Sequence, residues 1–255
     1  MPQAARQIPP LPVPVFLDRA RDAWPFLKGM AGGHRPGLLT RGADNAPAWR
    51  ALLSGLEARY PEAGPPFWAV RMWTNALWQP AYLAVAAVHL HGALPDVTGL
   101  SQMVRGSDVD GFLLPPGPEQ QGDEAALIGA AGAALRDFGE AMLAEINGFL
   151  RLKRLPAERL LADRLLSLVQ QLYRRDPEGM WTDYQALADR WLGAAGLAGQ
   201  GRLEPLALPE GRPALLLARK GCCLDYLVPP GTLCASCPKQ PEPLRRARQR
   251  AEHAA

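Results

Sequence analysis

The sequence predicts a mainly α-helical protein, with a helical bundle-like domain, a few short strands and a small C-terminal lobe that carries every cysteine. Three observations support this fold class. Ala- and Leu-rich segments with apolar residues three and four positions apart fill most of 123–192, the β-branched segments are short, and the four cysteines lie within residues 222–237. The chain has 255 residues, 48% of them hydrophobic, and can bury a large core. We therefore expect one large domain with an appendage rather than two equal domains.

In the first half of the chain, prolines and glycines mark the ends of the expected elements. Five prolines within residues 1–15 predict an extended arm. Asp44 or Asn45 is positioned to cap a helix that has Leu52 and Leu56 on one face. In chain order we expect the arm (1–15), a short helix interrupted at Pro25 (16–30), a glycine-rich loop (29–42), a helix (47–60), two core helices separated by Pro80 (66–77 and 82–91) and a short hairpin or irregular strands (97–114).

The second half of the chain predicts a helical bundle followed by a smaller lobe. Its longest helix is acidic at its start and basic at its end, as the helix dipole prefers. We expect helices over 123–155 and 157–175, a helix from Pro177 to Gly193 or Gly196, a linker rich in glycine and proline (199–211) and a strand over 214–218. The helical domain is thus expected to span 16–200, and the C-terminal lobe with its basic tail 201–255.

The four cysteines form a vicinal pair and a Cys-x-x-Cys separated by ten residues, at Cys222, Cys223, Cys234 and Cys237. A metal site needs its ligands within a few ångströms, and short spacings achieve this with little loss of chain entropy. A disulfide within the vicinal pair is disfavoured, because neighbouring Cα atoms lie about 3.8 Å apart and disulfides need about 4.4 to 6.8 Å. The chain begins without an apolar signal-peptide core, so we expect a reducing cytosol, which favours metal ligation.

The residues alone leave the nature of this site open. The side chains of a vicinal pair diverge in a strand and converge only through a local turn, which Gly221 is expected to supply, so the pair is unusual for zinc. An iron–sulfur cluster takes four thiolates over a wider volume, and Pro238 is similar to the Cys-Pro ending of bacterial ferredoxin motifs. Iron–sulfur ligation is favoured. A structural four-cysteine zinc site in a non-enzymatic interaction protein is the alternative, and disulfides or free thiols are the third possibility.

The pattern Cys-Cys-x10-Cys-x2-Cys, followed by a proline and preceded by two basic residues, resembles the C-terminal [2Fe-2S] motif of the ferric-siderophore reductases of the FhuF type. A helical region with a Trp-rich stretch and then a short cluster-binding tail is the order expected of that family. The resemblance implies a [2Fe-2S] cluster held by all four cysteines. It also implies a cytoplasmic one-electron oxidoreductase that releases iron from a ferric siderophore. Because the sequence shows no nucleotide-binding motif, electrons are expected from an external donor, either ferredoxin-like or a reductase.

Four further residues are candidates for a role near this site. Arg219 and Lys220 precede the first cysteine by three and two positions, close enough for their charges to tune the cluster. Arg71 and Asn75 share a helix face within the Trp-rich stretch and are candidate substrate contacts. The tryptophans of that stretch, Trp68, Trp73 and Trp78, are expected mainly to fill the core.

The histidines are not expected to form a metal site. His89 and His91 lie two positions apart on an expected helix and therefore face different directions. Together with His34 and Asp96 they are expected to have structural or solvent-facing roles.

The net charge of +3 comes from the tail, because residues 239–255 carry five basic and two acidic side chains. Residues 1–238 have no excess basic charge, which argues against nucleic-acid binding. The tail is expected to be a solvated helix, or to dock an acidic electron donor or an anionic membrane. The longest apolar run, residues 81–90, is shorter than the roughly 20 residues needed to cross a bilayer. We therefore expect a cytoplasmic protein with at most peripheral association with the inner face of the membrane.

Overall fold

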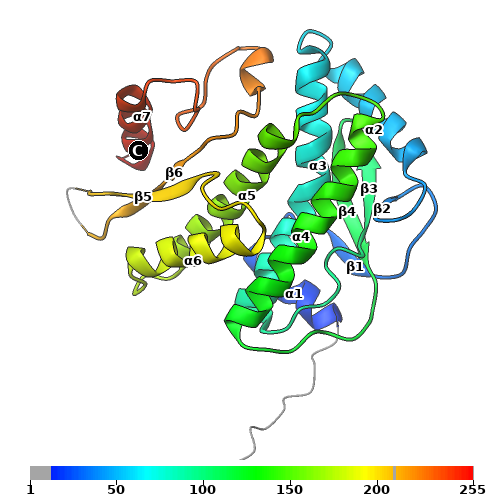
Figure 1. Cartoon of the computed structure of the whole chain (residues 1–255), viewed down its shortest axis with the longest axis horizontal. Coiled ribbons are helices and arrows are strands. Elements are labelled where there is room, and N and C mark those ends of the chain that lie inside the picture. The colour runs from blue at the N-terminus through cyan, green and yellow to red at the C-terminus, as the bar shows by residue number, and fades with distance from the viewer. Residues whose placement is uncertain (1–12, 209–210, 255) are drawn as a thin grey trace, which may run out of the picture.

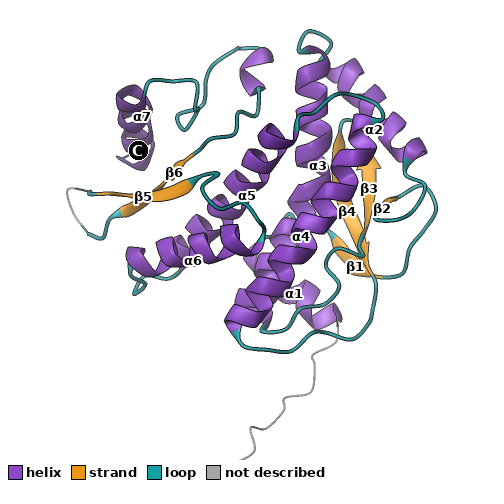
Figure 2. Ribbon diagram, viewed as in Figure 1, coloured by secondary structure: helices purple, strands orange, loops and turns teal. Residues whose placement is uncertain are grey.

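The computed structural model describes residues 13–208 and 211–254, so most of the expected proline-rich arm lies outside the described residues. Helices dominate, as predicted, and the central ones pack directly against one another (Figures 1 and 2). A small four-stranded sheet lies on one flank of these helices. A separate two-stranded hairpin, the loop that carries the four cysteines (the cysteine loop) and the last helix lie on the other flank. The helices are α1 (Val13–Ala23), α2 (Ala46–Arg59), α3 (Gly64–Ala86), α4 (Glu124–Asn147), α5 (Arg154–Arg175), α6 (Trp181–Ala194) and α7 (Glu242–Ala254).

The sheet contains the hairpin that was predicted over 97–114. Its strand order is β1-β4-β3-β2, with β1 parallel to β4 and the other neighbours antiparallel. It contacts α2 and α3, so it closes one side of the helical core. The strands are β1 (Gly29–Ala31), β2 (Leu39–Thr40), β3 (Ser101–Arg105) and β4 (Asp108–Leu114).

The N-terminal segment differs from the prediction at two places. α1 starts before the helix expected over 16–30 and ends before Pro25. The loop expected over 29–42 begins with β1 and ends near β2, because these short segments pair with β4 and β3. Gly29 permits the parallel pairing, since a Cβ at this position would stand 2.1 Å from the ring of Phe112. Sequence periodicity does not detect strands this short.

The two helices predicted on either side of Pro80 are a single helix, α3, which continues into a π-helical turn at Ala87–His91. Proline was expected to break the helix because it lacks the N–H that bonds the carbonyl four residues earlier. That carbonyl belongs to Ala76, and it accepts a hydrogen bond of 3.0 Å from the buried amide of Gln102 on β3. A side chain from the sheet therefore replaces the missing backbone donor. The helix predicted before α3, over 47–60, is confirmed as α2.

The longest described helix is α4, as predicted, and Asp123 caps it by accepting a hydrogen bond of 2.8 Å from the first turn. It ends at Asn147, however, and does not continue over 123–155. The Asn147 side chain accepts a hydrogen bond from the N–H of Leu152 and donates one to the carbonyl of the same residue. These bonds close the loop between α4 and α5. Pro156 then falls in the first turn of α5, where its missing N–H is not needed.

The segment that follows α5 contains one strand that was not predicted. The helix expected from Pro177 starts later, as α6. The strand predicted over 214–218 is confirmed as β6, but β5 lies within the segment predicted as a linker, 199–211. β5 contains Pro205 and pairs on one side only, with β6, which is the position in which a strand tolerates proline. The two strands are β5 (Arg202–Leu206) and β6 (Ala214–Ala218).

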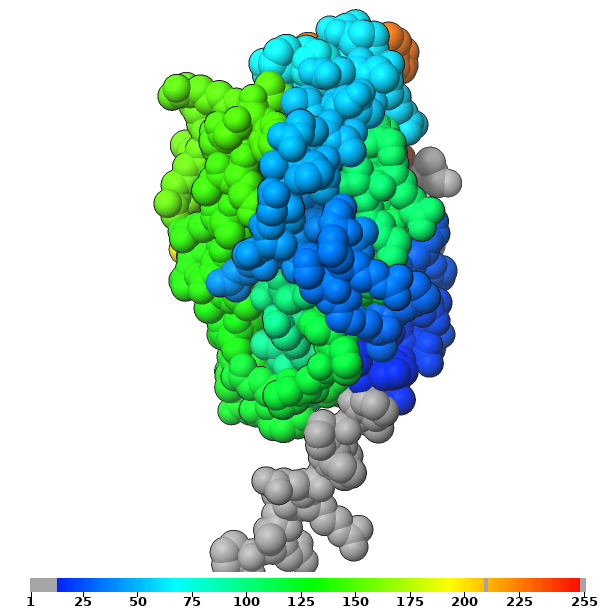
Figure 3. Space-filling model, turned by 90° about the vertical axis from the view of Figure 1, so that its right-hand side faces the viewer, coloured from blue at the N-terminus to red at the C-terminus, as the bar shows by residue number. Residues whose placement is uncertain are grey.

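One hydrophobic core joins α1 to α6 and reaches Leu203 and Leu215 in the β5–β6 hairpin. The largest fully buried side chains in it are Trp24, Trp49 and Trp191, and each indole N–H has a side-chain acceptor. From the side (Figure 3), the N-terminal segments in blue cover the face between α4 and the β3–β4 hairpin. Within the described residues, no helix combines the length and apolar character needed to span a bilayer.

Candidate functional site

The four cysteines lie on the loop that leads from β6 to α7, coloured orange in Figure 1. The chain turns directly after the vicinal pair, where Leu224 has a φ of 61°, and a 3₁₀ turn follows at Asp225–Leu227. A second turn closes where the N–H of Cys237 donates to the carbonyl of Cys234 at 3.0 Å. A leucine in the left-handed region costs about 1 kcal/mol, which other contacts of the loop must offset. The local turn beside the vicinal pair was expected at Gly221 and is made by Leu224.

Gly221 has a different role, which is close approach to α5. A Cβ on Gly221 would stand 2.7 Å from a carboxylate oxygen of Asp163 and 3.0 Å from the backbone nitrogen of Leu160. The bare backbone at this position lets the start of the cysteine loop lie against the helix. The loop is thereby fixed to the body immediately before its first cysteine.

Asp163 on α5 holds the start of the loop through three hydrogen bonds. Its carboxylate accepts from the side chain of Arg219 at 3.2 Å and from the backbone N–H groups of Gly221 and Lys220 at 3.0 and 3.4 Å. Only 3% of Asp163 is exposed. Burial raises the pKa of this carboxyl to about 6, although the Arg219 guanidinium opposes the shift. The carboxylate was not identified from the sequence, although a charged residue on the leucine-lined face of a helix is a detectable signal.

Two of the thiols, Cys223 and Cys234, interact across the loop. A hydrogen bond from Cys223 lowers the pKa of Cys234, and the positive charge of Arg219 lowers it further. The same hydrogen bond and partial burial raise the pKa of Cys223. All four cysteines are free thiols, of which Cys237 is buried and Cys234 is exposed. The pKa values of the vicinal pair and of the Cys-x-x-Cys are thus linked through one member of each.

The donor set suits a [2Fe-2S] cluster. Four thiols on one loop are the ligands that such clusters take, and the cationic Arg219 beside two of them favours their thiolate forms. Within the described part of the chain, no three side chains among histidine, cysteine, aspartate and glutamate converge on a single metal ion, and this includes the four cysteines. A [2Fe-2S] cluster requires only two thiolates on each of its two irons. The residues predicted to hold a cluster, Cys222, Cys223, Cys234 and Cys237, all lie on this one loop.

A cavity of about 290 Å³ opens beside Cys223, between α3, α5 and the cysteine loop. Arg71 and Asn75, the two predicted substrate contacts, both line it, and so does Arg219. The structure therefore brings together candidates that are separated by about 150 positions in the sequence. Further lining residues that sequence reasoning missed include Asp163, Arg164, Ser167 and Asp225.

Arg71 ties this cavity to the loop. Its guanidinium pairs with Asp225 at 2.7 Å, one turn after the vicinal cysteines, and lies over the ring of Phe67. Asn75 donates a hydrogen bond of 3.1 Å to the carbonyl of Ser107. Lys220 differs from Arg219, because its ammonium donates to the carbonyl of Gly199 at 2.6 Å and does not line the cavity.

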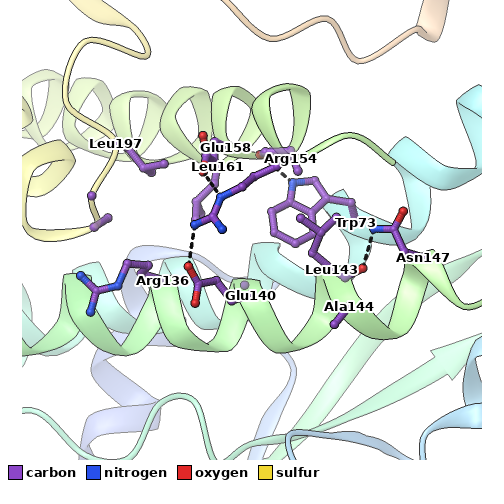
Figure 4. Close-up of a pocket in the computed structure, with 14 residues that line it drawn as sticks. Trp73, Arg136, Glu140, Leu143, Ala144, Asn147, Arg154, Glu158, Leu161 and Leu197 are labelled. Carbon is purple, nitrogen blue, oxygen red and sulfur yellow. Dashed lines mark hydrogen bonds and ion pairs between the residues drawn. The ribbon is translucent and has the colours of Figure 1, made fainter. Parts of the chain in front are cut away.

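A second cavity, of about 340 Å³, lies between α4 and α5 (Figure 4). Arg154 extends across it and pairs with both Glu140 and Glu158 at 2.6 Å. Trp73 and Leu161 line both cavities. No cysteine lines the second cavity, so the first is the one that adjoins the candidate cluster site.

The three histidines considered in the sequence analysis, His34, His89 and His91, have structural partners, as expected. His89 accepts a hydrogen bond from the indole of Trp191 at 3.0 Å, and burial lowers its pKa. His91 pairs with Glu119 at 2.9 Å. His34 lies 3.0 Å from the Thr40 hydroxyl, within hydrogen-bonding distance.

The fold and the loop together indicate an iron–sulfur protein whose predicted cluster ligands lie at the edge of a helical body. Residues 219–239 match the family model described as the FhuF 2Fe-2S C-terminal domain, and all four cysteines fall within the match. The chain thus carries an FhuF-type C-terminal domain, and the predicted resemblance and the [2Fe-2S] cofactor are confirmed. No solved structure matches the chain.

Proposed function

We propose that the protein is a ferric-siderophore reductase, in which the cavity beside Cys223 holds the ferric chelate. The observation that carries this proposal is the position of the cavity, which has the predicted ligand Cys223 and Arg219 in one wall and Arg71 and Asn75 in another. The matched family supports a redox role of this kind. The bound cluster would supply single electrons, received from an external donor.

The chemistry of the substrate explains why one electron is sufficient. Siderophores hold Fe(III) through hard oxygen donors, and adding one electron gives Fe(II), a softer ion that such donors bind poorly. Reduction is therefore the release step: the donor loses one electron, the iron gains it and the chelator leaves as protons replace the metal. No residue of the chain needs to form a covalent bond.

The residues of the cavity would position the chelate. Arg71 is held by Asp225 and by the ring of Phe67, and Asn75 by Ser107, so both are fixed before the substrate arrives. Three arginines line the cavity, and two of them have carboxylate partners in it. The third, Arg164, lies over the ring of Tyr82. Polar side chains in these positions suit the oxygen-rich surface of a chelate.

A single-turnover experiment tests the proposal. The protein is reduced anaerobically with photoreduced deazaflavin and mixed with a ferric trihydroxamate chelate, and released Fe(II) is trapped with ferrozine. We expect Fe(II) in proportion to the cluster content. Undiminished Fe(II) release by Cys223→Ser protein that has lost its cluster would falsify the proposal.

Variants of the cavity locate the substrate. We expect Arg71→Gln and Asn75→Ala to raise the KM for the chelate roughly tenfold, a loss of about 1.4 kcal/mol of binding. Arg136→Gln is the matched control, because Arg136 lines the second cavity. An equal rise of KM in the control variant would place the substrate elsewhere.

A further inference from the structure

The last part of the C-terminal lobe, residues 219–255, is electrostatically unlike the rest of the chain. From residue 219 onward it carries seven basic and three acidic side chains, a net charge of +4, whereas residues 1–218 have a net charge of −1. A [2Fe-2S] cluster with four thiolates would contribute about −2 when oxidised, which leaves the lobe positive. The basic residues are Arg219, Lys220, Lys239, Arg245, Arg246, Arg248 and Arg250.

Four of these arginines lie on α7, which is held against the hairpin through one face. Gln249 on that face is buried and donates to the carbonyl of Leu217 in β6 at 3.2 Å. Arg246 pairs with Glu204 of β5 at 3.7 Å. α7 lies at the outer edge of the molecule in Figure 1, so its other face is presented outward.

The outward face of α7 has an apolar centre with basic neighbours. Leu244 is 51% exposed, and Ala247 and Ala251 follow it at three- and four-residue steps and are also exposed. Arg250 is exposed beside them. An apolar centre surrounded by charge is the usual composition of a protein interface, and here the arginines of α7 outnumber its two acidic residues, Glu242 and Glu252.

Two hydrogen bonds connect α7 to the cysteine loop. Arg248 on α7 donates to the side chain of Gln240 at 2.6 Å, and Gln240 donates to the carbonyl of Cys234 at 2.7 Å. Cys234 is exposed and does not line the cavity, whereas Cys223 lines the cavity. One predicted ligand, Cys223, therefore faces the cavity, and another, Cys234, lies on the exposed side of the loop.

We propose that the outward face of α7, with Lys239 and the exposed edge of the loop at Cys234, docks an acidic one-electron carrier protein. This inference rests on the proposed function, because it assigns the entry side of the electron that leaves at the cavity. The carrier loses one electron and the protein gains it, with no transfer of atoms. An anionic membrane is the less favourable partner, since Leu244 is the one large apolar side chain on this face and insertion into lipid needs several.

The test measures docking directly, with an oxidised plant-type ferredoxin of strongly negative net charge as the probe. Its Kd for the cluster-loaded protein is measured by calorimetry at low ionic strength, where charges act over about 30 Å. Lys239→Gln/Arg250→Glu, called the α7 variant, changes the net charge by −3 on the proposed docking face, where both side chains are exposed. Arg41→Gln/Arg50→Glu, on exposed positions of the body, makes the same change elsewhere. We expect the α7 variant to weaken binding by on the order of tenfold and the control variant by less than twofold.

The rate of cluster reduction by reduced ferredoxin gives a second readout, and photoreduced deazaflavin gives the comparison, because a small reductant needs no docking surface. We expect the α7 variant to be slower with ferredoxin only, and the difference to vanish at high salt. The single variant Arg250→Glu repeats the test with the least change to the helix.

Three outcomes would overturn the inference: equal weakening in both double variants, unchanged ferredoxin binding in the α7 variant, or loss of binding to phosphatidylglycerol vesicles in that variant while ferredoxin binding is retained. None of these measurements uses a siderophore. A protein that docks ferredoxin but reduces no ferric chelate would refute the proposed function and leave the docking surface intact.

Discussion

The helical body and the cysteine loop are stabilised in different ways. The body is held by one continuous hydrophobic core with buried tryptophans, whereas most residues of the loop are partly or fully exposed. The loop depends instead on a few polar contacts. Asp163 holds its start, Arg71 binds Asp225 in its middle, and Gln240 bonds Cys234 near its end.

This difference shows how a small site can be added to a stable scaffold. Packing free energy in the body does not depend on the thiols, because the buried residues of α1 to α6 form the core without them. The loop gains its order from directional contacts and, when loaded, from the metal. We therefore expect changes in the loop to affect the cluster strongly and the fold weakly, and changes in the body to do the reverse.

The largest effect is expected from removing a ligand. Each of the variants Cys222→Ser, Cys223→Ser, Cys234→Ser and Cys237→Ser should lose most of its cluster, because an iron would lack a thiolate. Iron and sulfide analysis with absorption spectroscopy measures this loss. The far-ultraviolet circular dichroism of the body should stay unchanged. A collapse of the helical signal in these variants would show that folding of the body depends on the loop, contrary to the expected difference between the two regions.

The contact between the two regions should give the next largest effect, through Asp163. Its pKa of about 6 lies above the usual value of about 4 for a free carboxyl, so the folded protein binds this proton more tightly than the unfolded chain. The stability from this group is complete below about pH 4 and is lost as pH rises through about 6, by at most about 3 kcal/mol.

Urea unfolding of Asp163→Asn and wild-type protein between pH 4 and 7 measures this contribution. We expect the stability difference, wild type minus variant, to fall as pH rises. Asp137→Asn on α4 is the control, since Asp137 is an exposed carboxylate that contacts only its neighbour Arg136 among the described ion pairs. A difference that stays constant with pH in Asp163→Asn would mean that the carboxyl is already ionised throughout.

The sequence predicted the two regions to different extents. In the body, helical periodicity located most of the helices, but it could not show that Gln102 would supply the donor missing at Pro80, or that Asn147 would end α4. Both effects depend on side chains that meet only in the fold. In the loop, the spacing of the thiols predicted the chemistry, whereas their support by Asp163 is a contact across 58 positions that no local pattern reveals.

A smaller effect, confined to the body, is expected at Pro80. Gln102→Leu should cost about 1 to 2 kcal/mol, because it leaves the buried carbonyl of Ala76 without a donor. The double variant Pro80→Ala/Gln102→Leu should recover part of this loss, since an alanine in place of the proline restores the backbone donor of the helix. Thermal unfolding of the two single variants and the double variant forms a complete cycle. Additive losses in this cycle would show that Gln102 does not replace the bond missing at Pro80, and cluster content should stay normal throughout.

The smallest expected effect is on the reduction potential, and it separates the two basic residues that precede the cysteines. A [2Fe-2S] cluster with four thiolates carries about −2 when oxidised and about −3 when reduced, so nearby positive charge favours the reduced state. Arg219 is held by Asp163 in the wall of the cavity beside Cys223, whereas the ammonium of Lys220 is directed to Gly199. We therefore expect Arg219→Gln to lower the midpoint potential by tens of millivolts, where about 59 mV is a tenfold change, and Lys220→Gln to lower it by less. Protein-film voltammetry at low salt measures both. Equal shifts in the two variants would mean that the potential responds to net charge alone, and no shift in either would mean that the body does not tune the cluster through these residues.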